Sequence, residues 1–181
     1  MRVITVANRK GGTAKTTTVV NLAYGFAQAN KRVIVLDLDN QGHVMHGLKA
    51  LGCVQQSDIT ELPLNTFFTS IVKCADNIYA TDVDTCNANT NEEITLDVLR
   101  SWCDSEAVTK HFDIVLIDTP PTLSPQLMAA LSAATDIIIP ATPLPLASDG
   151  VQKLLNACRN AMAERKFRAT KLTILPVMVE Q

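Results

Sequence analysis

The stretch of sequence that decides the fold is residues 8–18, which read Asn8-Arg9-Lys10-Gly11-Gly12-Thr13-Ala14-Lys15-Thr16-Thr17-Thr18. It follows an apolar run at residues 3–7 that is typical of a buried strand, and it leads into a helix-type segment from residue 15 to about residue 30. A glycine-containing turn between a strand and a helix points successive backbone N–H groups at one spot, where the helix dipole adds about half a positive charge. The stretch therefore predicts a phosphate-binding loop.

The rest of the chain alternates short β-branched runs with longer helix-type segments, which is typical of a mostly parallel sheet with helices on both faces. The expected strands are residues 3–7, 33–36, 77–81, 114–117, 137–139 and 172–177. The expected helices are residues 15–30, 92–108, 125–134 and 148–165, and residues 84–91 are expected to form a polar loop. No internal repeat or linker interrupts this pattern, so we predict a single α/β domain over residues 1–181.

Composition argues against several classes of protein. Of the 181 residues, 47% are hydrophobic, and no apolar stretch approaches the length of about 20 residues that a membrane span needs. A strand-type run that begins at Val3 leaves no room for a signal peptide, so we expect a cytoplasmic protein without membrane contact. The formal net charge of −2 argues against a protein that coats nucleic acid with its whole surface. The five cysteines show neither a CxxC pair nor zinc-ligand spacing, which predicts buried or reduced thiols.

Acidic residues follow two of the expected strands. Asp37 and Asp39 come directly after residues 33–36, and Asp118 ends the apolar run Ile114-Val115-Leu116-Ile117. Ligands of open α/β sheets bind at the carboxyl ends of the strands, so we expect these carboxylates near the phosphate-binding loop. An acid at the end of a buried strand is a typical magnesium contact, direct or through water. The sequence therefore predicts that Asp118 contacts Mg²⁺.

Together these motifs resemble the deviant Walker A ATPases of the ParA and MinD type. The standard P-loop pattern is G-x-x-x-x-G-K-S/T, and Arg9 and Ala14 occupy its two glycine positions. Residues 10–17 instead resemble K-G-G-x-G-K-S/T-S/T, from which only Ala14 departs. Residues 37–41 are similar to the family's D-x-D-P-Q motif with Asn40 in place of proline, and residues 118–121 match its D-T-P-P segment. The similarity runs from Met1 to about Val177, although residues 53–111 contribute almost nothing specific to it.

The resemblance implies an ATP site with magnesium. Residues that bind the nucleotide would be Gly11, Gly12, Thr13, Ala14, Lys15, Thr16 and Thr17. Residues that support the metal would be Thr16, Asp39 and Asp118. For catalysis, Lys15 would reach the β- and γ-phosphates, Asp39 would orient the attacking water, and the signature Lys10 would reach into the site of a second subunit.

Within the superfamily the resemblance favours the ParA-like branch. It implies an ATPase that switches between a monomer and an ATP-bound homodimer to partition or position DNA, as plasmid or chromosome, or another cargo. It also implies a stimulating adaptor protein of the ParB kind, non-specific DNA binding, and a cytoplasmic, nucleoid-associated location. Residues 151–171 carry an excess of positive charge that is a candidate DNA-facing patch, from Lys153, Arg159, Arg165, Lys166, Arg168 and Lys171. These side chains spread around a helix, so ordinary solvated charges are the alternative.

The sequence also allows us to weigh alternatives to a ParA-like ATPase. A MinD-like protein needs a C-terminal amphipathic helix, and an iron protein of the nitrogenase branch needs cysteines near Asp118, neither of which the sequence contains. Ala14 could cost on the order of 1 kcal/mol of backbone strain where glycine is usual, so a catalytically weak nucleotide-binding scaffold that acts through its dimer interface is the alternative function. The chain stops at Gln181, soon after the last expected strand, which suggests a truncated or compact member.

Overall fold

An eight-stranded sheet forms the centre of the computed structural model, which describes residues 1–39, 42–50, 55–59, 71–81, 96–143, 148–163 and 167–178. The strand order is β3-β4-β5-β2-β6-β1-β7-β8. The strands are β1 (Arg2–Val6), β2 (Val33–Asp37), β3 (Gln55–Gln56), β4 (Ile71–Ala75), β5 (Ile78–Thr81), β6 (Ile114–Asp118), β7 (Asp136–Ala141) and β8 (Lys171–Pro176). All neighbours from β5 to β8 pair in parallel, whereas β3–β4 and β4–β5 are antiparallel. The predicted α/β fold with a mostly parallel sheet is confirmed.

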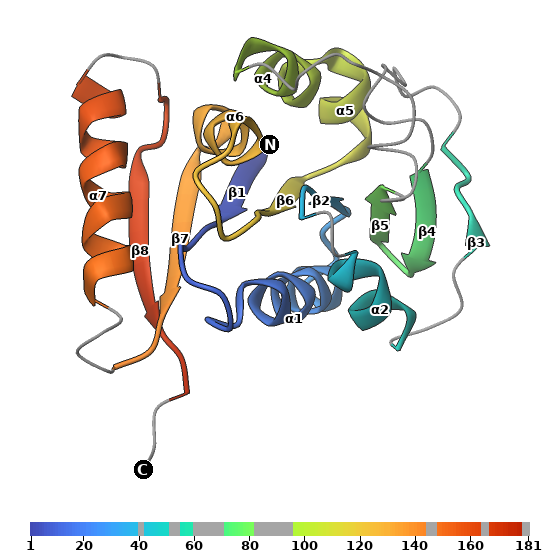
Figure 1. Ribbon diagram of the computed structural model, residues 1–181. Helices are drawn as coiled ribbons and strands as arrows, with labels where there is room; N and C mark the ends of the chain where they lie inside the picture. The colour runs from blue at the N-terminus through green and yellow to red at the C-terminus, as the bar shows by residue number, and fades with distance from the viewer. Residues whose placement is uncertain are drawn as a thin grey trace.

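Helices cover both faces of this sheet (Figure 1). The described helices are α1 (Lys15–Gln28), α2 (His43–Lys49), α4 (Leu96–Asp104), α5 (Glu106–His111), α6 (Pro125–Ala133) and α7 (Ser148–Ala163). Helices α1 and α2 lie on one side, and α4, α5 and α6 lie on the other. Every residue of the central strands β2 and β6 is buried, because a parallel strand covered on both faces needs apolar side chains at nearly every position.

The structure contains three elements that the sequence patterns do not predict, namely β3, β4 and α2. Strands β4 and β5 form an antiparallel hairpin whose turn contains Asp76 and Asn77, and Asn77 has a φ of 61°. An Asp-Asn pair between two apolar runs is a turn signal, because these residues tolerate the left-handed conformation. That signal could have found the hairpin.

The expected helix at residues 92–108 is helical in nearly all of the part that the structure describes, but it is not a single helix. It is divided into α4 and α5 at Ser105, whose backbone is extended with a φ of −63° and a ψ of 146°. The Ser105 hydroxyl accepts a hydrogen bond from the Val108 N–H at 3.4 Å, so this residue caps a new helix. The expected polar loop at residues 84–91 lies outside the described residues.

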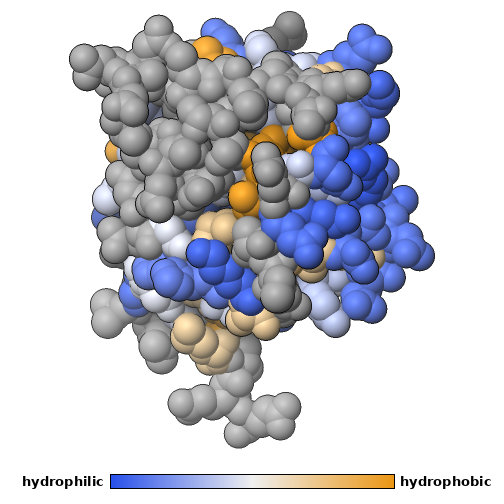
Figure 2. All heavy atoms as spheres, turned by 90° about the vertical axis from the view of Figure 1, so that its right-hand side faces the viewer, coloured by the Kyte–Doolittle hydropathy of each residue, from blue (hydrophilic) through white to orange (hydrophobic). Residues whose placement is uncertain are grey.

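Polar side chains cover the β3 edge of the sheet. Figure 2 views the molecule from this side, and many of its described residues are hydrophilic, with small hydrophobic areas near the middle of the view. On this edge the Lys73 ammonium lies 3.8 Å from the Asp58 carboxylate, and the Tyr79 hydroxyl donates to Asp58 at 3.0 Å. These two contacts join the segment that follows β3 to strands β4 and β5.

Three described cysteines, Cys74, Cys103 and Cys158, are buried and free. Burial raises the pKa of Cys74 to about 11, of Cys103 to about 12 and of Cys158 to about 11, so these thiols stay protonated at neutral pH. Their state agrees with the expectation of buried thiols, and Cys53 and Cys86 lie outside the described residues. No helix in the described part of the chain has the length and apolar character to cross a membrane.

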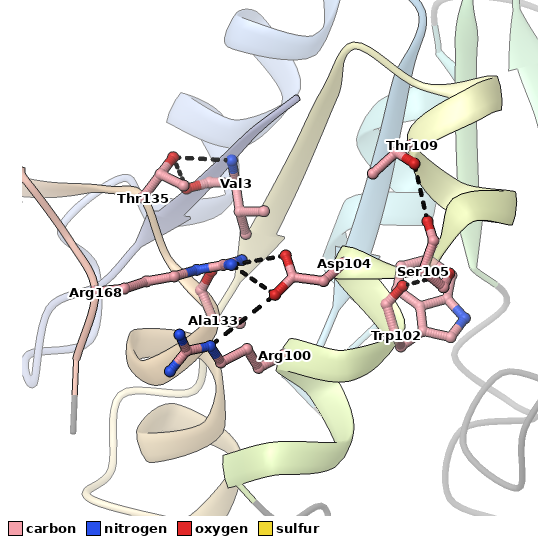
Figure 3. A network of polar contacts seen from close by, with 9 residues as sticks. All are labelled: Val3, Arg100, Trp102, Asp104, Ser105, Thr109, Ala133, Thr135 and Arg168. Carbon is pink, nitrogen blue, oxygen red and sulfur yellow. Dashed lines mark hydrogen bonds and ion pairs between the residues drawn. The ribbon is translucent and has the colours of Figure 1, made fainter.

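Arg168 ties three elements together at the amino-terminal ends of the parallel strands (Figure 3). Its Nε and Nη2 atoms donate to the Ala133 carbonyl at the end of α6, at 3.0 and 2.8 Å. Its Nη1 atom donates to both carboxylate oxygens of Asp104 at the end of α4, at 2.6 and 2.7 Å. The inclusion of Arg168 in the candidate DNA-facing patch is therefore wrong, because its guanidinium is engaged within the fold.

We expect Arg168→Ala to lower the free energy of unfolding by about 1–3 kcal/mol, since it leaves the Ala133 carbonyl without its partner. Urea denaturation followed by circular dichroism measures this change. Arg100→Ala is the matched control, because Arg100 lies 4.0 Å from the same Asp104 carboxylate and should contribute about 0.5 kcal/mol or less. If the two variants lost equal free energy of unfolding, the hydrogen bonds of Arg168 to α4 and α6 would not be the stabilising contacts assigned here.

Candidate functional site

The loop between β1 and α1 has the backbone of a phosphate-binding turn. Gly12 and Ala14 have φ angles of 70° and 57°, in the left-handed region that glycine adopts freely. The Ala14 carbonyl accepts hydrogen bonds from the Thr18 N–H at 2.9 Å and from the Thr18 hydroxyl at 2.7 Å. Alanine at such an angle costs on the order of 1 kcal/mol, and these two bonds hold it there. The position at which the sequence departs from the family pattern is therefore one that requires a glycine-like backbone.

The loop surrounds a pocket of about 470 Å³. All residues that we expect to bind nucleotide line this pocket, namely Gly11, Gly12, Thr13, Ala14, Lys15, Thr16 and Thr17. Asp39, His43, Pro121 and Met178 complete the lining. Helix α1 has no side-chain cap at Ala14 and no acidic residue in its first turn, so its first N–H groups are available to an anion.

Lys15 brings a buried positive charge to this pocket. The residue is 8% exposed, and burial lowers the pKa of its ammonium. The negative charges of Asp118 and Asp39 act in the opposite direction and raise it. A buried cation beside carboxylates is stabilised further by any phosphate that enters the pocket, so Lys15 is suited to bind one.

The expected acids lie at the carboxyl ends of adjacent strands. Asp37 of β2 is in register with Asp118 of β6, and both are almost fully buried. Asp118 accepts hydrogen bonds from the Thr16 hydroxyl at 2.6 Å and from the Thr119 N–H at 3.1 Å. The carboxylate of Asp37 accepts from the N–H groups of Asp39 at 3.0 Å and Val44 at 3.2 Å. Asp37 thus holds both sides of the turn that carries Asp39.

Burial makes these two acids weak. It raises the pKa of Asp37 to about 7, with a further increase from the charge of Asp118. Burial also raises the pKa of Asp118 to about 6, against the hydrogen bond from Thr16 and the charge of Lys15, which lower it. A positive charge brought between these groups would favour their ionised forms.

The oxygen atoms present suit a magnesium ion that is shared with a ligand. The Thr16 hydroxyl and the Asp118 carboxylate are hard oxygen donors in direct contact, and Mg²⁺ is commonly held by one or two such groups together with phosphates and water. Within the described residues no group of three or more His, Cys, Asp or Glu side chains could hold a metal by itself. Asp39 lines the pocket, and its role toward a metal stays a prediction.

Two polar residues of the site have no role in the sequence-based prediction. The Thr119 hydroxyl donates to the Val6 carbonyl at 2.9 Å and ties β6 to β1 behind the loop. The Asn8 amide donates to the Pro140 carbonyl at 2.6 Å and accepts from the Lys10 N–H at 3.1 Å. No local sequence pattern signals the contacts to Pro140 and Val6, which join residues 132 and 113 positions apart, whereas the contact between Asn8 and Lys10 spans two residues and is the Asx-turn type that asparagine favours.

Comparisons with known proteins bear on the family and the fold of this chain. A family model described as AAA domain, AAA_31, matches residues 1–172. The chain is 32% identical to the chromosome-partitioning ATPase Soj of Thermus thermophilus, over 99% of the chain and 70% of that protein. It is 28% identical to the chromosome partitioning protein ParA of Myxococcus xanthus, over 84% of the chain and only 56% of that protein. The structure of apo McdA from Cyanothece has a TM-score of 0.73 at 22% identity, over 97% of this chain and 72% of that one.

We expect the nucleotide-free protein to lose stability as the pH rises from about 5 to about 8. The pKa values of Asp37 and Asp118 in the folded state lie above their ordinary value of 3.8, so the folded state binds more protons in this window than the unfolded state does. The stability that these groups contribute is therefore present near pH 4 and is lost as the pH rises through their folded-state pKa values. Urea unfolding at several pH values measures the slope.

Asp37→Asn is the variant that tests the cause. It removes one of the two buried acids while keeping the size of the side chain, so the dependence of stability on pH should become shallower. A slope identical to that of the unmodified protein, or a stability that increases with pH, would contradict the assignment.

Proposed function

The chain belongs to the ParA-like family of P-loop ATPases, and from this premise we propose that it binds ATP with Mg²⁺ and hydrolyses it to ADP and phosphate. The observation that carries the proposal is the pocket at the start of α1, which brings together the glycine loop, the buried Lys15 and Asp39. A nucleotide triphosphate is the ligand that uses a row of backbone N–H groups, a buried ammonium and nearby carboxylates at once.

Each residue has a distinct task in this proposal. The loop N–H groups and Lys15 hold the phosphates, and Thr16 and Asp118 hold magnesium, which when bound neutralises charge on the phosphate oxygens. Asp39 orients the attacking water, and Asp37 fixes the turn of Asp39 through the two N–H groups that it accepts from. The protein thus contributes chiefly position and charge, as phosphoryl transfer requires.

We further propose that ATP drives the formation of a homodimer that partitions or positions DNA or another cargo. Relatives that are chromosome-partitioning proteins support this proposal. Lys10 is exposed at the rim of the loop, which is compatible with a role across a subunit interface. Lys153, Arg159 and Lys171 are exposed and remain candidates for contacts to non-specific DNA. An adaptor protein that stimulates hydrolysis, and a cytoplasmic location on the nucleoid, belong to the same proposal.

A second candidate function follows from Ala14. Its φ of 57° stores strain in the loop, and Ala14 lines the pocket at a position where the family pattern has glycine. Slow or absent hydrolysis would make the protein a nucleotide-dependent scaffold that acts through its dimer interface. ATP turnover of the purified protein separates the two functions, because the scaffold binds ATP and dimerises without releasing phosphate.

We expect Lys15→Ala to abolish measurable ATP binding while the fold is retained, because the ammonium supplies the buried positive charge of the pocket. Isothermal titration calorimetry with ATP and Mg²⁺ measures the affinity, and circular dichroism checks the fold. Lys31→Ala is the matched control, since Lys31 is an exposed lysine that follows α1 and lies outside the pocket lining. An unchanged affinity in Lys15→Ala would place the phosphate site elsewhere.

We expect Lys10→Ala to bind ATP with nearly the affinity of the unmodified protein but to lose ATP-induced dimerisation and the turnover that depends on it. The reason is that Lys10 is exposed, whereas Lys15 already serves the nucleotide of its own subunit. Light scattering with ATP, ADP and a non-hydrolysable analogue measures the oligomeric state. A Lys10→Ala variant that dimerises and hydrolyses ATP normally would show that Lys10 is an ordinary solvated lysine.

A further inference from the structure

Asn8 occupies a junction that none of the roles above explains. It lies two residues beyond the end of β1, and it is 1% exposed. Its Nδ2 atom donates to the carbonyl of Pro140 in β7 at 2.6 Å. Its Oδ1 atom accepts from the backbone N–H of Lys10 at 3.1 Å. One buried amide thus connects the neighbouring strand of the sheet to the backbone of the signature lysine.

The first turn of α7 also reaches this junction. A β-carbon placed on Gly150 would lie 3.4 Å from Asn8 Oδ1 and 3.8 Å from the Lys10 β-carbon, so the helix backbone is close to both residues. On the other side of Lys10, the Thr13 hydroxyl donates to the Lys10 carbonyl at 3.2 Å. Both backbone groups of Lys10 are therefore held by side chains, although the residue itself is exposed.

We propose that Asn8 is a positioning residue that sets the place and direction of Lys10 by fixing its backbone to β7 and against the start of α7. An amide donates and accepts at the same time, which a carboxylate at neutral pH or an apolar side chain of this size does not do. The inference rests on the proposed function, in which Lys10 acts across the interface of an ATP-bound dimer. It assigns to Asn8 a part in dimerisation and turnover but none in holding the nucleotide.

The hydrogen bonds of the loop explain why Asn8 should affect the position of Lys10 without affecting the binding of the nucleotide. The part of the loop that faces the phosphates is anchored independently, because Thr18 holds the Ala14 carbonyl and Thr16 contacts Asp118. Loss of the Asn8 bridge releases the Lys10 backbone while these anchors remain. A displacement of about 1 Å in a group that must meet a reacting centre can lower a rate by about a hundredfold, so the effect should appear in turnover rather than in ATP affinity.

The test uses Asn8→Ser, whose side chain is too short to bridge Pro140 and Lys10. We expect ATP affinity within about twofold of the unmodified protein, because the phosphate anchors stay in place, whereas ATP-induced dimerisation weakens and kcat falls by about tenfold to a hundredfold. Calorimetry, light scattering and phosphate release measure the three quantities. Lys10→Ala gives the reference for complete loss of the lysine.

Thr5→Val is the matched control for lost stability. Thr5 is fully buried in β1, and its hydroxyl donates to the Ala130 carbonyl at 2.8 Å, so the variant also loses a buried hydrogen bond to a backbone carbonyl without touching Lys10. It should be destabilised and yet dimerise and turn over ATP normally. An Asn8→Ser variant with normal dimerisation and kcat overturns the inference, and so does a Thr5→Val variant with the same functional defect as Asn8→Ser.

Amide hydrogen exchange provides a readout that needs no variant. In the nucleotide-free protein the Lys10 N–H should exchange slowly, because it is bonded to a buried oxygen, and exchange at the rate of an unstructured amide overturns the inference. The failure of the inference is distinct from the failure of the proposed function. If the unmodified protein neither dimerises with ATP nor hydrolyses it, the proposed function fails; if it does both and Asn8→Ser does so equally well, only the role of Asn8 fails.

Discussion

Ionisable groups buried at the carboxyl ends of three adjacent strands constrain this structure more than any other feature. Lys15 follows the loop after β1, Asp118 ends β6 and Asp37 ends β2, and each of them is at most 8% exposed. Water solvates none of these groups well, so each must find a partner within the protein or in a ligand. The register of β2 against β6 brings the acids together, and the turn after β1 brings the ammonium to them. The surrounding hydrogen bonds from Thr16, Thr119, Asp39 and Val44 are the compensation that this arrangement requires.

Backbone strain and the burial of acids make the site locally unfavourable, and the rest of the fold offsets their free-energy cost. Ala14 is held at a positive φ, and Asp37 and Asp118 have pKa values raised by burial. Strained backbone and weakened acids of this kind persist only where the surrounding structure imposes them. Here the imposing structure is the pair of fully buried central strands, β2 and β6, with helices on both faces. A cation brought between Asp37 and Asp118 would favour their ionised forms, which links the energetics of these acids to the proposed ligand.

The carboxyl ends of the parallel strands form the candidate site, whereas contacts at their amino ends stabilise the fold. At the carboxyl ends, the loop and the acids form a pocket. At the amino ends, side chains close the fold instead: Arg168 joins α4 to α6, and Thr135 donates to the Val3 carbonyl and accepts from the Val3 N–H. Substitutions at the amino ends should therefore act on stability, and substitutions at the carboxyl ends on ligand binding. Asn8 also lies at the carboxyl ends, where it joins the loop to β7, and its substitution should act on dimerisation and turnover rather than on ATP binding.

The sequence by itself determined the features that depend on short segments. The apolar strands, the loop at residues 8–18 and helix α1 follow one another along the chain, so periodicity and turn chemistry were enough to predict them. The rule that ligands bind at the carboxyl ends of parallel strands also predicted that Asp39 would lie near this loop, although the chemical roles of these residues stay predictions. The family resemblance placed Thr16 and Asp118 at one site, and the structure adds their direct hydrogen bond. Only the tertiary structure decided that Asn8 meets Pro140 and that Arg168 meets Asp104 rather than solvent. The physical reason is that these contacts join residues at least 64 positions apart, and such pairings depend on strand order and register, which no local pattern encodes.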